Sequence, residues 1–439
     1  MNQQLFISRR NKLLKKMEPS SVAIFFSAPS AYRNADCEYP YRQHSDFLYL
    51  TGFSEPEAVL LIIKYNEISS KSILFNRVND KVIETWFGSY LGQKDAILKL
   101  GIDKALPFTE INQQLYQLLN GLDVVYHAQG EFSYADEIIV TTLNRLRRRN
   151  QKKLKVPSAQ IDWRSMLHEM RLFKSPQEIV LMREANKISA KAHLRAMQIC
   201  QPNMYEYQLA AEIEYQFAYQ GVKATAYPTI VGSGENACIL HYTKNDTIMK
   251  DGNLVLVDAG AEYQGYSSDI TRTFPVNGKF SQPQREIYNI VLMALNTALT
   301  LYRPDVTIHK IIKEVINIKI KGLIKLGILQ NKVYKLNQNK FHLPFFIHGL
   351  SHWLGLDVHD VGDYGTNQDR LLKPGMVLSV EPGIYIPSDA DVPEDYRGIG
   401  IRIEDNILIT KDGNENLTED IIKDPDEIES LMLEAKYRV

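Results

Sequence analysis

The most constraining stretch of the sequence is residues 254–274, LVLVDAGAEYQGYSSDITRTF. Two apolar, β-rich runs flank the turn formers AEYQG, which is the pattern of a β-hairpin. Counted outward from between Tyr263 and Gln264, Asp258 and Asp269 fall at equal distances, which predicts a cross-strand pair with Cβ atoms roughly 4.5 to 5.5 Å apart. Two carboxylates so close repel each other unless a cation lies between them. The hairpin therefore favours a metal site, and two ordinary surface aspartates beside a turn are the alternative.

Three histidines gather in a second dense stretch, residues 345–365, FFIHGLSHWLGLDVHDVGDYG. His348, His352 and His359 are interleaved with glycines, which let the backbone and a ligand approach each other closely. A single histidine among apolar residues is more often a core residue than a ligand. Three in so short a stretch, with Gly349 and Gly355 between them, favour a functional site.

Two further carboxylates lie in apolar, strand-like runs. Glu381 lies in GMVLSVEPGIYI and Glu404 in GIGIRIEDNILIT, beside Arg402. A charged side chain within a buried strand is rarely tolerated unless it is paired or bound to a metal. A buried ion pair between Arg402 and a glutamate is the structural alternative. It would explain one glutamate, but hardly both together with the two aspartates.

Together the candidate ligands are Asp258, Asp269, Glu381, Glu404 and His352. Two divalent cations would neutralise the four carboxylates. That balance suits a two-metal hydrolytic centre with ions about 3.5 to 4 Å apart. Ligation dominated by oxygen with one nitrogen fits manganese, cobalt, iron or zinc.

The chain of 439 residues is long enough for two or three domains. Strand and helix patterns alternate up to about residue 149, which indicates a small α/β domain. The predicted strands there are 21–26, 46–53, 58–64, 72–76 and 123–128, and the predicted helices are 1–17, 94–100, 111–122 and 135–149. Ser175, Pro176 and Glu178 then form a strong helix start. Beyond it we predict helices at 178–199 and 206–221 and strands at 225–234 and 238–243 before the hairpin, and helices at 283–302 and 307–327 after it.

Composition excludes several classes of protein. The net charge of −1 gives no general reason to expect a nucleic-acid or membrane partner. The basic run at 145–155 lacks interleaved aromatic residues and is interpreted as a helix end and linker. The three cysteines, Cys37, Cys200 and Cys238, have no CxxC spacing, so neither a disulfide framework nor a cysteine zinc site is indicated. The N-terminus lacks the apolar core of a signal peptide and no run is long enough to span a membrane, so we expect a cytoplasmic protein.

The order Asp, Asp, His, Glu, Glu in these contexts resembles the metallopeptidases of the pita-bread fold, which include methionine aminopeptidase, prolidase, creatinase and aminopeptidase P. Length argues against a simple methionine aminopeptidase. The stretches 33–60, 86–96, 161–176, 231–243 and 348–362 make the chain most similar to bacterial aminopeptidase P, the Xaa-Pro aminopeptidase. The resemblance spans nearly the whole chain. It implies an α+β fold with a creatinase-like N-terminal α/β domain, residues 1–173, and a catalytic pita-bread domain, residues 174–439.

The resemblance also implies a mechanism. Asp258 binds one metal ion, and Asp269 and Glu404 bridge the two ions. His352 and Glu381 complete the second. A hydroxide held between the ions attacks the scissile carbonyl, and Glu381 shuttles a proton toward the leaving proline nitrogen. Manganese is the expected metal, with cobalt or zinc as alternatives.

The remaining roles implied by the resemblance concern the substrate. The catalytic set includes His241 and His359, which stabilise the tetrahedral intermediate, and Arg402, which orients a metal-bound carboxylate. The implied substrate-binding residues are Asp36, Trp86, His348 and Tyr385. The first two come from the N-terminal domain, and a neighbouring subunit is one source for them; for Trp86 the alternative is a plain core residue. The expected assembly is a homodimer or homotetramer.

The Xaa-Pro bond has no amide hydrogen, and its ring fixes φ, so a rigid apolar slot can select it. His348 with Trp353 or Tyr385 could form such a slot. Prolidase, which uses the same centre on dipeptides, is an alternative. A catalytically inactive pita-bread domain that binds peptides or histones is another, but that class is expected to have lost metal ligands.

Overall fold

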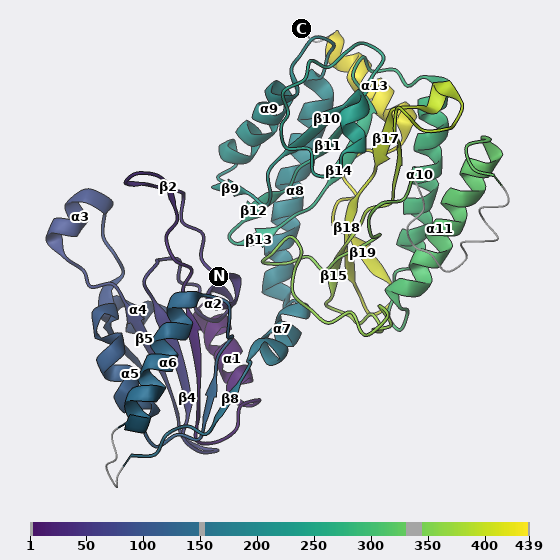
Figure 1. The fold of residues 1–439 in the computed structure, drawn as a ribbon. Coiled ribbons are helices and arrows are strands. Elements are labelled where there is room, and N and C mark those ends of the chain that lie inside the picture. The colour runs from purple at the N-terminus through teal and green to yellow at the C-terminus, as the bar shows by residue number, and fades with distance from the viewer. Residues whose placement is uncertain (1–2, 149–153, 331–344, 438–439) are drawn as a thin grey trace. The chain divides into compact units, whose positions relative to one another are not determined.

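The computed structural model describes residues 3–148, 154–330 and 345–437. The chain divides into two compact units, Met1–Met170 and Arg171–Val439, each described here by itself (Figure 1). Both combine helices with β-sheets, as an α+β fold requires. The domain boundary after residue 173 stays a prediction. In the described parts of the chain, none of the helices combines the length and the apolar character needed to cross a lipid bilayer.

The N-terminal unit is built on a six-stranded mixed sheet, ordered β6-β5-β4-β1-β7-β8. Strand β1 pairs antiparallel with β4 and parallel with β7. Its strands are β1 (Ser21–Phe26), β2 (Tyr32–Asn34), β3 (Cys37–Glu38), β4 (Val59–Lys64), β5 (Ser70–Asn76), β6 (Lys104–Pro107), β7 (Val124–Tyr126) and β8 (Ala159–Ile161). Its helices are α1 (Gln3–Leu14), α2 (Ser45–Thr51), α3 (Lys81–Phe87), α4 (Gly92–Leu100), η1 (Phe108–Glu110), α5 (Ile111–Leu119), α6 (Ser133–Arg148) and α7 (Arg164–Leu172), which ends beyond the unit boundary.

The C-terminal unit places short sheets between two helix pairs, α8 with α9 and α10 with α11 (Figure 1). The helices are α8 (Pro176–Ile199), α9 (Glu206–Tyr219), η2 (Gly234–Cys238), α10 (Gln282–Leu301), α11 (Ile308–Lys325), η3 (Glu394–Tyr396) and α13 (Pro425–Lys436). The strands are β9 (Ala224–Thr225), β10 (Ile230–Ser233), β11 (Leu254–Asp258), β12 (Ala261–Tyr263), β13 (Tyr266–Ser267), β14 (Thr271–Pro275), β15 (Val377–Val380), β16 (Gly383–Ile386), β17 (Ile399–Arg402), β18 (Asp405–Ile409) and β19 (Asn414–Asn416).

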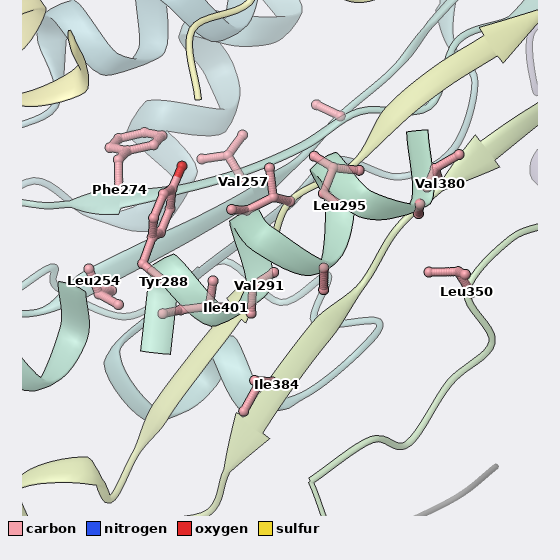
Figure 2. Close-up of a cluster of buried hydrophobic side chains, with 14 of the residues drawn as sticks. Leu254, Val257, Phe274, Tyr288, Val291, Leu295, Leu350, Val380, Ile384 and Ile401 are labelled. Carbon is pink, nitrogen blue, oxygen red and sulfur yellow. The ribbon is translucent and has the colours of Figure 1, made fainter. Parts of the chain in front are cut away.

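The large core of this unit lies between the helices and one face of the sheets. Tyr288, Val291 and Leu295 recur at helical spacing along α10, and all are fully buried against strand side chains (Figure 2). Burial of one such side chain stabilises the fold by about 1.5–3 kcal/mol. Because side chains alternate along a strand, Leu256 and Asp258 of β11 share a face, and Leu256 belongs to a small separate cluster. The packed core thus leaves a second strand face for polar side chains.

The hairpin of residues 254–274 is confirmed, but its predicted register is wrong. The turn residues are Gln264 and Gly265, with φ angles of 49° and 88°. Two positive φ angles characterise a type I′ turn, whose twist matches the flanking strands. This turn lies further along the chain than predicted, so Asp258 pairs with Thr271. Asp269 lies in the irregular stretch between β13 and β14, and the predicted cross-strand pair of aspartates does not form.

Two strand predictions are also wrong. Residues 46–51 of the predicted strand 46–53 belong to α2, whose C-cap is Gly52 with a φ of 66°. A short apolar run is compatible with either a strand or a buried helix, and here helical packing prevails. Residues 238–243 do not form a strand: Cys238 ends the 3-10 helix η2 and the rest follow it, because Gly234 (φ 57°) turns the chain out of β10. The backbone at Ala237 then approaches β17 so closely that only glycine fits at Gly400.

Candidate metal centre

One cavity of the C-terminal unit gathers the predicted metal ligands. Its volume is about 630 Å³. The residues that line it come from several separate stretches of the chain, and they include Asp258, Asp269, His352, Glu381 and Glu404. The two glutamates do not lie within strands as predicted. Glu381 lies between β15 and β16, and Glu404 between β17 and β18, where each strand pair is interrupted. Breaks in the strands therefore direct carboxylates into the cavity without charging the packed core.

Three of these side chains form a tight cluster. Asp269, His352 and Glu404 each offer a ligand atom, and these atoms lie within 4.8 Å of one another. His352 Nδ1 lies 3.0 Å from the carbonyl oxygen of Trp353, an acceptor that requires a hydrogen on Nδ1. His352 Nε2 faces Asp269 Oδ2 at 3.1 Å and Glu381 Oε1 at 3.6 Å. A lone pair on Nε2 would repel both oxygens, so this nitrogen must carry a proton or meet a cation. A metal ion fits that position.

Asp258 is held by two donors at the edge of the cluster. Tyr227 donates a hydrogen bond of 2.6 Å to Oδ1, and Arg402 Nη2 lies 2.5 Å from Oδ2. The alternative of an Arg402 pair with a glutamate is thus not what forms, because the described partner of the guanidinium is this aspartate. Arg402 Nη1 also donates to the hydroxyl of Tyr385, at 2.9 Å. The contacts with Tyr227 and Arg402 therefore fix the orientation of the Asp258 carboxylate.

Glu404 supplies a direct test of whether a metal fits. Thr271 donates a hydrogen bond of 2.8 Å to Oε2. The other oxygen, Oε1, is buried and has no hydrogen-bond partner in the described structure. A buried carboxylate oxygen without a partner is costly, and a divalent cation would satisfy it. Glu404 is 2% exposed, so bulk water does not offer an alternative.

The protonation equilibria of the cluster show the same deficit of positive charge. Burial, together with the charges of Asp269, Glu381 and Asp258, raises the pKa of Glu404 well above its ordinary value. Burial raises the pKa of Glu381 to about 7, and Asp269 adds to that effect. The pKa of His352 rises to about 9, because the Asp269 carboxylate outweighs the effect of burial. Protons occupy the place that cations would take, and bound cations would displace them.

Comparison with known proteins identifies the fold of both units. The model of metallopeptidase family M24 matches residues 180–411, and that of the aminopeptidase P N-terminal domain matches residues 6–126. The chain is 59% identical over 436 residues to the Xaa-Pro aminopeptidase of Escherichia coli, covering 99% of each chain. The chain belongs to metallopeptidase family M24. The M24 unit therefore has the pita-bread fold, preceded by the creatinase-like domain that the sequence predicted.

Two solved structures extend the likeness within family M24. Proline aminopeptidase P II from Yersinia pestis matches with a TM-score of 0.97 at 59% identity, covering 99% of this chain and 100% of that one. Zinc-substituted E. coli aminopeptidase P in complex with product matches with a TM-score of 0.97 at 60% identity, covering 99% of both chains. The resemblance that the metal-ligand pattern suggested is confirmed.

The predicted histidines of this M24 chain lie around the cluster. His241, His348 and His359 all line the cavity. The ring of His359 stands 4.3 Å from that of His352, and burial and the neighbouring His352 lower its pKa. His348 Nε2 lies 2.7 Å from the hydroxyl of Tyr385, which is itself buried.

Of the other predicted residues, Trp353 does not line this cavity, and Asp36 and Trp86 belong to the N-terminal unit. Trp353 is fully buried in the hydrophobic core and stacks on Tyr364, so its proposed place in a proline slot is wrong. Asp36 lies exposed between β2 and β3 of the N-terminal unit. Trp86 is 78% exposed on α3 of the same unit, so the alternative of a plain core tryptophan is wrong. Their role as substrate contacts stays a prediction.

Three residues that orient the carboxylates were not predicted from the sequence. Tyr227 and Thr271 donate to Asp258 and Glu404 as described. Asn406 holds the backbone of Asp269 from both sides, since it accepts from Asp269 N at 3.0 Å and donates to Asp269 O at 2.6 Å. Each residue type is ordinary in a strand or loop. Thr271 and Asn406 each lie two positions after a predicted ligand, Asp269 and Glu404, and this proximity is the one sequence feature that could have predicted them.

Proposed function

We propose that the protein is a metal-dependent Xaa-Pro aminopeptidase, which hydrolyses the bond between the first residue of a peptide and a proline in the second position. The observation that carries this proposal is the convergence of the predicted carboxylates and His352 in one cavity of an M24 unit. The identity to a relative named Xaa-Pro aminopeptidase over almost the whole chain supports the same substrate class.

Two divalent ions would be held by Asp258, Asp269, His352, Glu381 and Glu404. When bound, such ions lower the pKa of water to near neutrality and polarise the scissile carbonyl, which supplies the nucleophile for hydrolysis. The ligand set, mostly oxygen with one nitrogen, suits manganese. Cobalt and zinc are alternatives, and the zinc-substituted form of the E. coli relative supports zinc as a substitute.

The residues of the chain provide the proton transfers. Glu381 lines the cavity beside the other ligands, so its carboxylate would accept a proton from the attacking water and deliver it to the leaving proline nitrogen. His241 and His359 face the cavity from outside the ligand set, so they would donate hydrogen bonds to the carbonyl oxygen as negative charge develops. Arg402 keeps Asp258 in a fixed orientation through the 2.5 Å contact.

The proline ring would lie beside His348, whose orientation is fixed by the buried hydroxyl of Tyr385. Asp36 and Trp86 would reach the substrate from a neighbouring subunit of a homodimer or homotetramer. The exposed indole of Trp86 supports that role, because a large exposed aromatic side chain commonly marks a contact surface. We propose a cytoplasmic location for the assembly. To test whether two subunits share the site, sedimentation analysis compares the oligomeric state of wild type and Trp86→Ala, and steady-state kinetics compares their kcat/KM.

The decisive experiment compares peptides in metal-loaded enzyme. Cleavage of an Xaa-Pro-Xaa tripeptide with release of the free first residue supports an aminopeptidase. Cleavage of only the Xaa-Pro dipeptide would instead assign a prolidase. Metal analysis of the same preparation identifies the bound ions. An Ala-Ala-Ala tripeptide serves as the control for proline selectivity, and its equal hydrolysis would contradict the proposal.

A further inference from the structure

A second cavity adjoins the metal centre, and it is lined by a buried lysine, Lys319, that has no role in the proposed mechanism. Its volume is about 630 Å³, and it shares His348 and Gly349 with the cavity of the metal ligands. One face of helix α11 forms its wall, through the residues His309, Ile312, Val315, Ile316 and Lys319. The polar side chains of Asn367 and Gln368 contribute to the lining. A substrate lying over the metal ligands could therefore extend past His348 into this space.

Lys319 is the unusual residue of this wall. It is 6% exposed, although lysine is almost never buried without a partner. Its Nζ lies 3.3 Å from the carbonyl oxygen of Gly383 and 4.1 Å from the centroid of the Phe346 ring. No carboxylate forms an ion pair with it in the described structure, and the sequence 331–344, outside the described residues, contains neither Asp nor Glu. Lys319 is thus a buried cation held by a carbonyl and an aromatic ring.

Burial lowers the pKa of Lys319 to about 7. An anion beside Nζ would favour the ammonium form and would remove the penalty of burying an uncompensated charge. The geometry also orients a peptide. A peptide whose first residue lies over the metal ligands would extend past His348 into the second cavity, where an anionic group would be attracted to Lys319. The second cavity therefore suits the part of the substrate that follows proline.

We propose that this second cavity is a carboxylate subsite, in which Lys319 receives a carboxylate from the peptide segment after proline. This inference rests on the proposed peptidase function and deepens it, because it names the chemistry of the leaving peptide. Two sources supply the same group: the C-terminal carboxylate of a short peptide, or an acidic side chain in the third position.

Two pairs of peptides separate these sources. Ala-Pro-Ala and its C-terminal amide differ only in the terminal carboxylate. Ala-Pro-Glu amide and Ala-Pro-Gln amide differ only in the side-chain charge. We expect wild type to favour the charged member of at least one pair by about tenfold or more in kcat/KM, the effect of one hydrogen bond to a charged group. Preference in the first pair assigns the peptide terminus, and preference in the second assigns an acidic side chain.

The variant Lys319→Met removes the charge and keeps a long apolar side chain. We expect the ratio of kcat/KM between charged and neutral members to fall to about one. Lys321→Met, on the same helix but exposed, is the matched control and should retain the wild-type ratio. Equal rates within both pairs in wild type, or an unchanged ratio in Lys319→Met, would overturn the subsite.

A second measurement does not depend on turnover. If the ammonium of Lys319 is uncompensated, Lys319→Met should raise the Tm of the peptide-free protein, whereas Lys321→Met should leave it unchanged. A lower Tm for Lys319→Met would show that the charge is paired within the protein, and it would overturn the inference. If no form of the enzyme cleaves any of the four peptides, the proposed function fails. The Tm comparison then decides by itself whether the charge of Lys319 is uncompensated in the peptide-free protein.

Discussion

At the scale of single residues, the candidate centre depends on how each ligand is aimed. The ligand types could be predicted from the sequence, because carboxylates in apolar runs stand out by their cost of burial. Their orienting partners could not. Tyr227 and Thr271 are uncharged and common in strands, and their hydrogen bonds to Asp258 and Glu404 depend on tertiary contacts. Trp353 illustrates the opposite error, because its position beside His352 suggested a substrate contact, yet its side chain points into the core.

The first prediction concerns Tyr227. Tyr227→Phe removes the donor to Asp258 Oδ1 and keeps the ring, so we expect metal affinity or kcat/KM to fall by about 10–100-fold. Isothermal titration with manganese and steady-state kinetics measure the two effects. Tyr219→Phe, at an exposed position of the same unit, is the control and should leave both unchanged. Wild-type metal affinity and activity in Tyr227→Phe would show that Arg402 alone suffices to orient Asp258.

The second prediction concerns proton release. Without metal, Glu381 has a pKa of about 7 and His352 one of about 9, both raised above their ordinary values. Raised values mean that the metal-free site holds protons at neutral pH, which must leave when cations bind. Metal affinity should therefore increase with pH between about 6 and 9. Titrations in buffers of different ionisation enthalpy count the protons. Affinity independent of pH in this window would contradict the proposed ligand set.

At the scale of secondary-structure elements, one buried ion-pair network connects the end of α7 to the stretch that carries the predicted histidines, residues 348–360. Arg171 Nη2 lies 2.5 Å from Asp360 Oδ1, and Lys174 Nζ lies 2.9 Å from Asp360 Oδ2. All three side chains are at most 2% exposed. Asp360 directly follows His359, so the network fixes the backbone that carries this histidine. The two cations lower the pKa of Asp360 despite its burial.

The third prediction tests this network. Asp360→Asn leaves two buried cations poorly compensated, and we expect the free energy of unfolding to fall by about 3–5 kcal/mol at neutral pH. Because the folded-state pKa is lowered, the wild-type advantage is present above the ordinary value of about 3.9 and is lost as pH falls through the lower folded value. Urea unfolding from pH 7 downward measures this. Asp357→Asn, which removes the more exposed partner of Arg171, should cost about 1 kcal/mol or less.

The fourth prediction concerns the close approach of two irregular segments, one between β11 and β12 and the other between β13 and β14. A Cβ atom at Gly260 would lie 1.9 Å from the carbonyl oxygen of Ser268, the residue before Asp269. Gly260→Ala should therefore push this segment aside, lower the free energy of unfolding by about 1–3 kcal/mol, and weaken metal binding. Gly413→Ala, where nothing lies within 4 Å, is the control with about 0.5 kcal/mol or less. Equal effects of the two variants in thermal unfolding would contradict the argument.

The elements themselves were mostly predictable from periodicity. Helix α8 begins directly after Ser175 as predicted, because a cap is a local signal, and the predicted starts of α10 and α11 each lie one residue from the observed ones. The pairing register of the hairpin could not be predicted from local signals of this kind. A type I′ turn at Gln264 and Gly265, instead of one residue earlier, moves the partner of Asp258 to Thr271. Short apolar runs such as residues 46–53 also remain ambiguous, since burial on all sides erases the difference between helix and strand periods.

At the scale of the whole molecule, the chain divides into a unit with the predicted ligands and a unit without them. Metal binding to the native state should stabilise only the unit that binds. The stabilisation amounts to about 2.7 kcal/mol at a metal concentration of 100 times Kd. The two units can therefore be distinguished by their response to metal, whatever their arrangement.

The fifth prediction follows from this difference. Removal of metal with a chelator should reduce amide hydrogen-exchange protection in β11, β14 and β18 of the C-terminal unit. Protection of β1, β4 and β5 in the N-terminal unit should stay the same. Exchange measured by mass spectrometry with and without manganese checks both. Equal loss of protection in both units would mean that the ions stabilise the molecule by another route.

The predicted ligands are spread along the chain from Asp258 to Glu404. Arg272 of β14 donates a hydrogen bond of 2.6 Å to the backbone oxygen of Glu404, which connects the last ligand to the hairpin that carries the first two. Such a site depends on contacts between distant parts of the sequence, which form late. A nascent chain still on the ribosome would lack the closing carboxylate until Glu404 had emerged. A translation product that ends before Glu404 would lack this ligand and should not hydrolyse peptides.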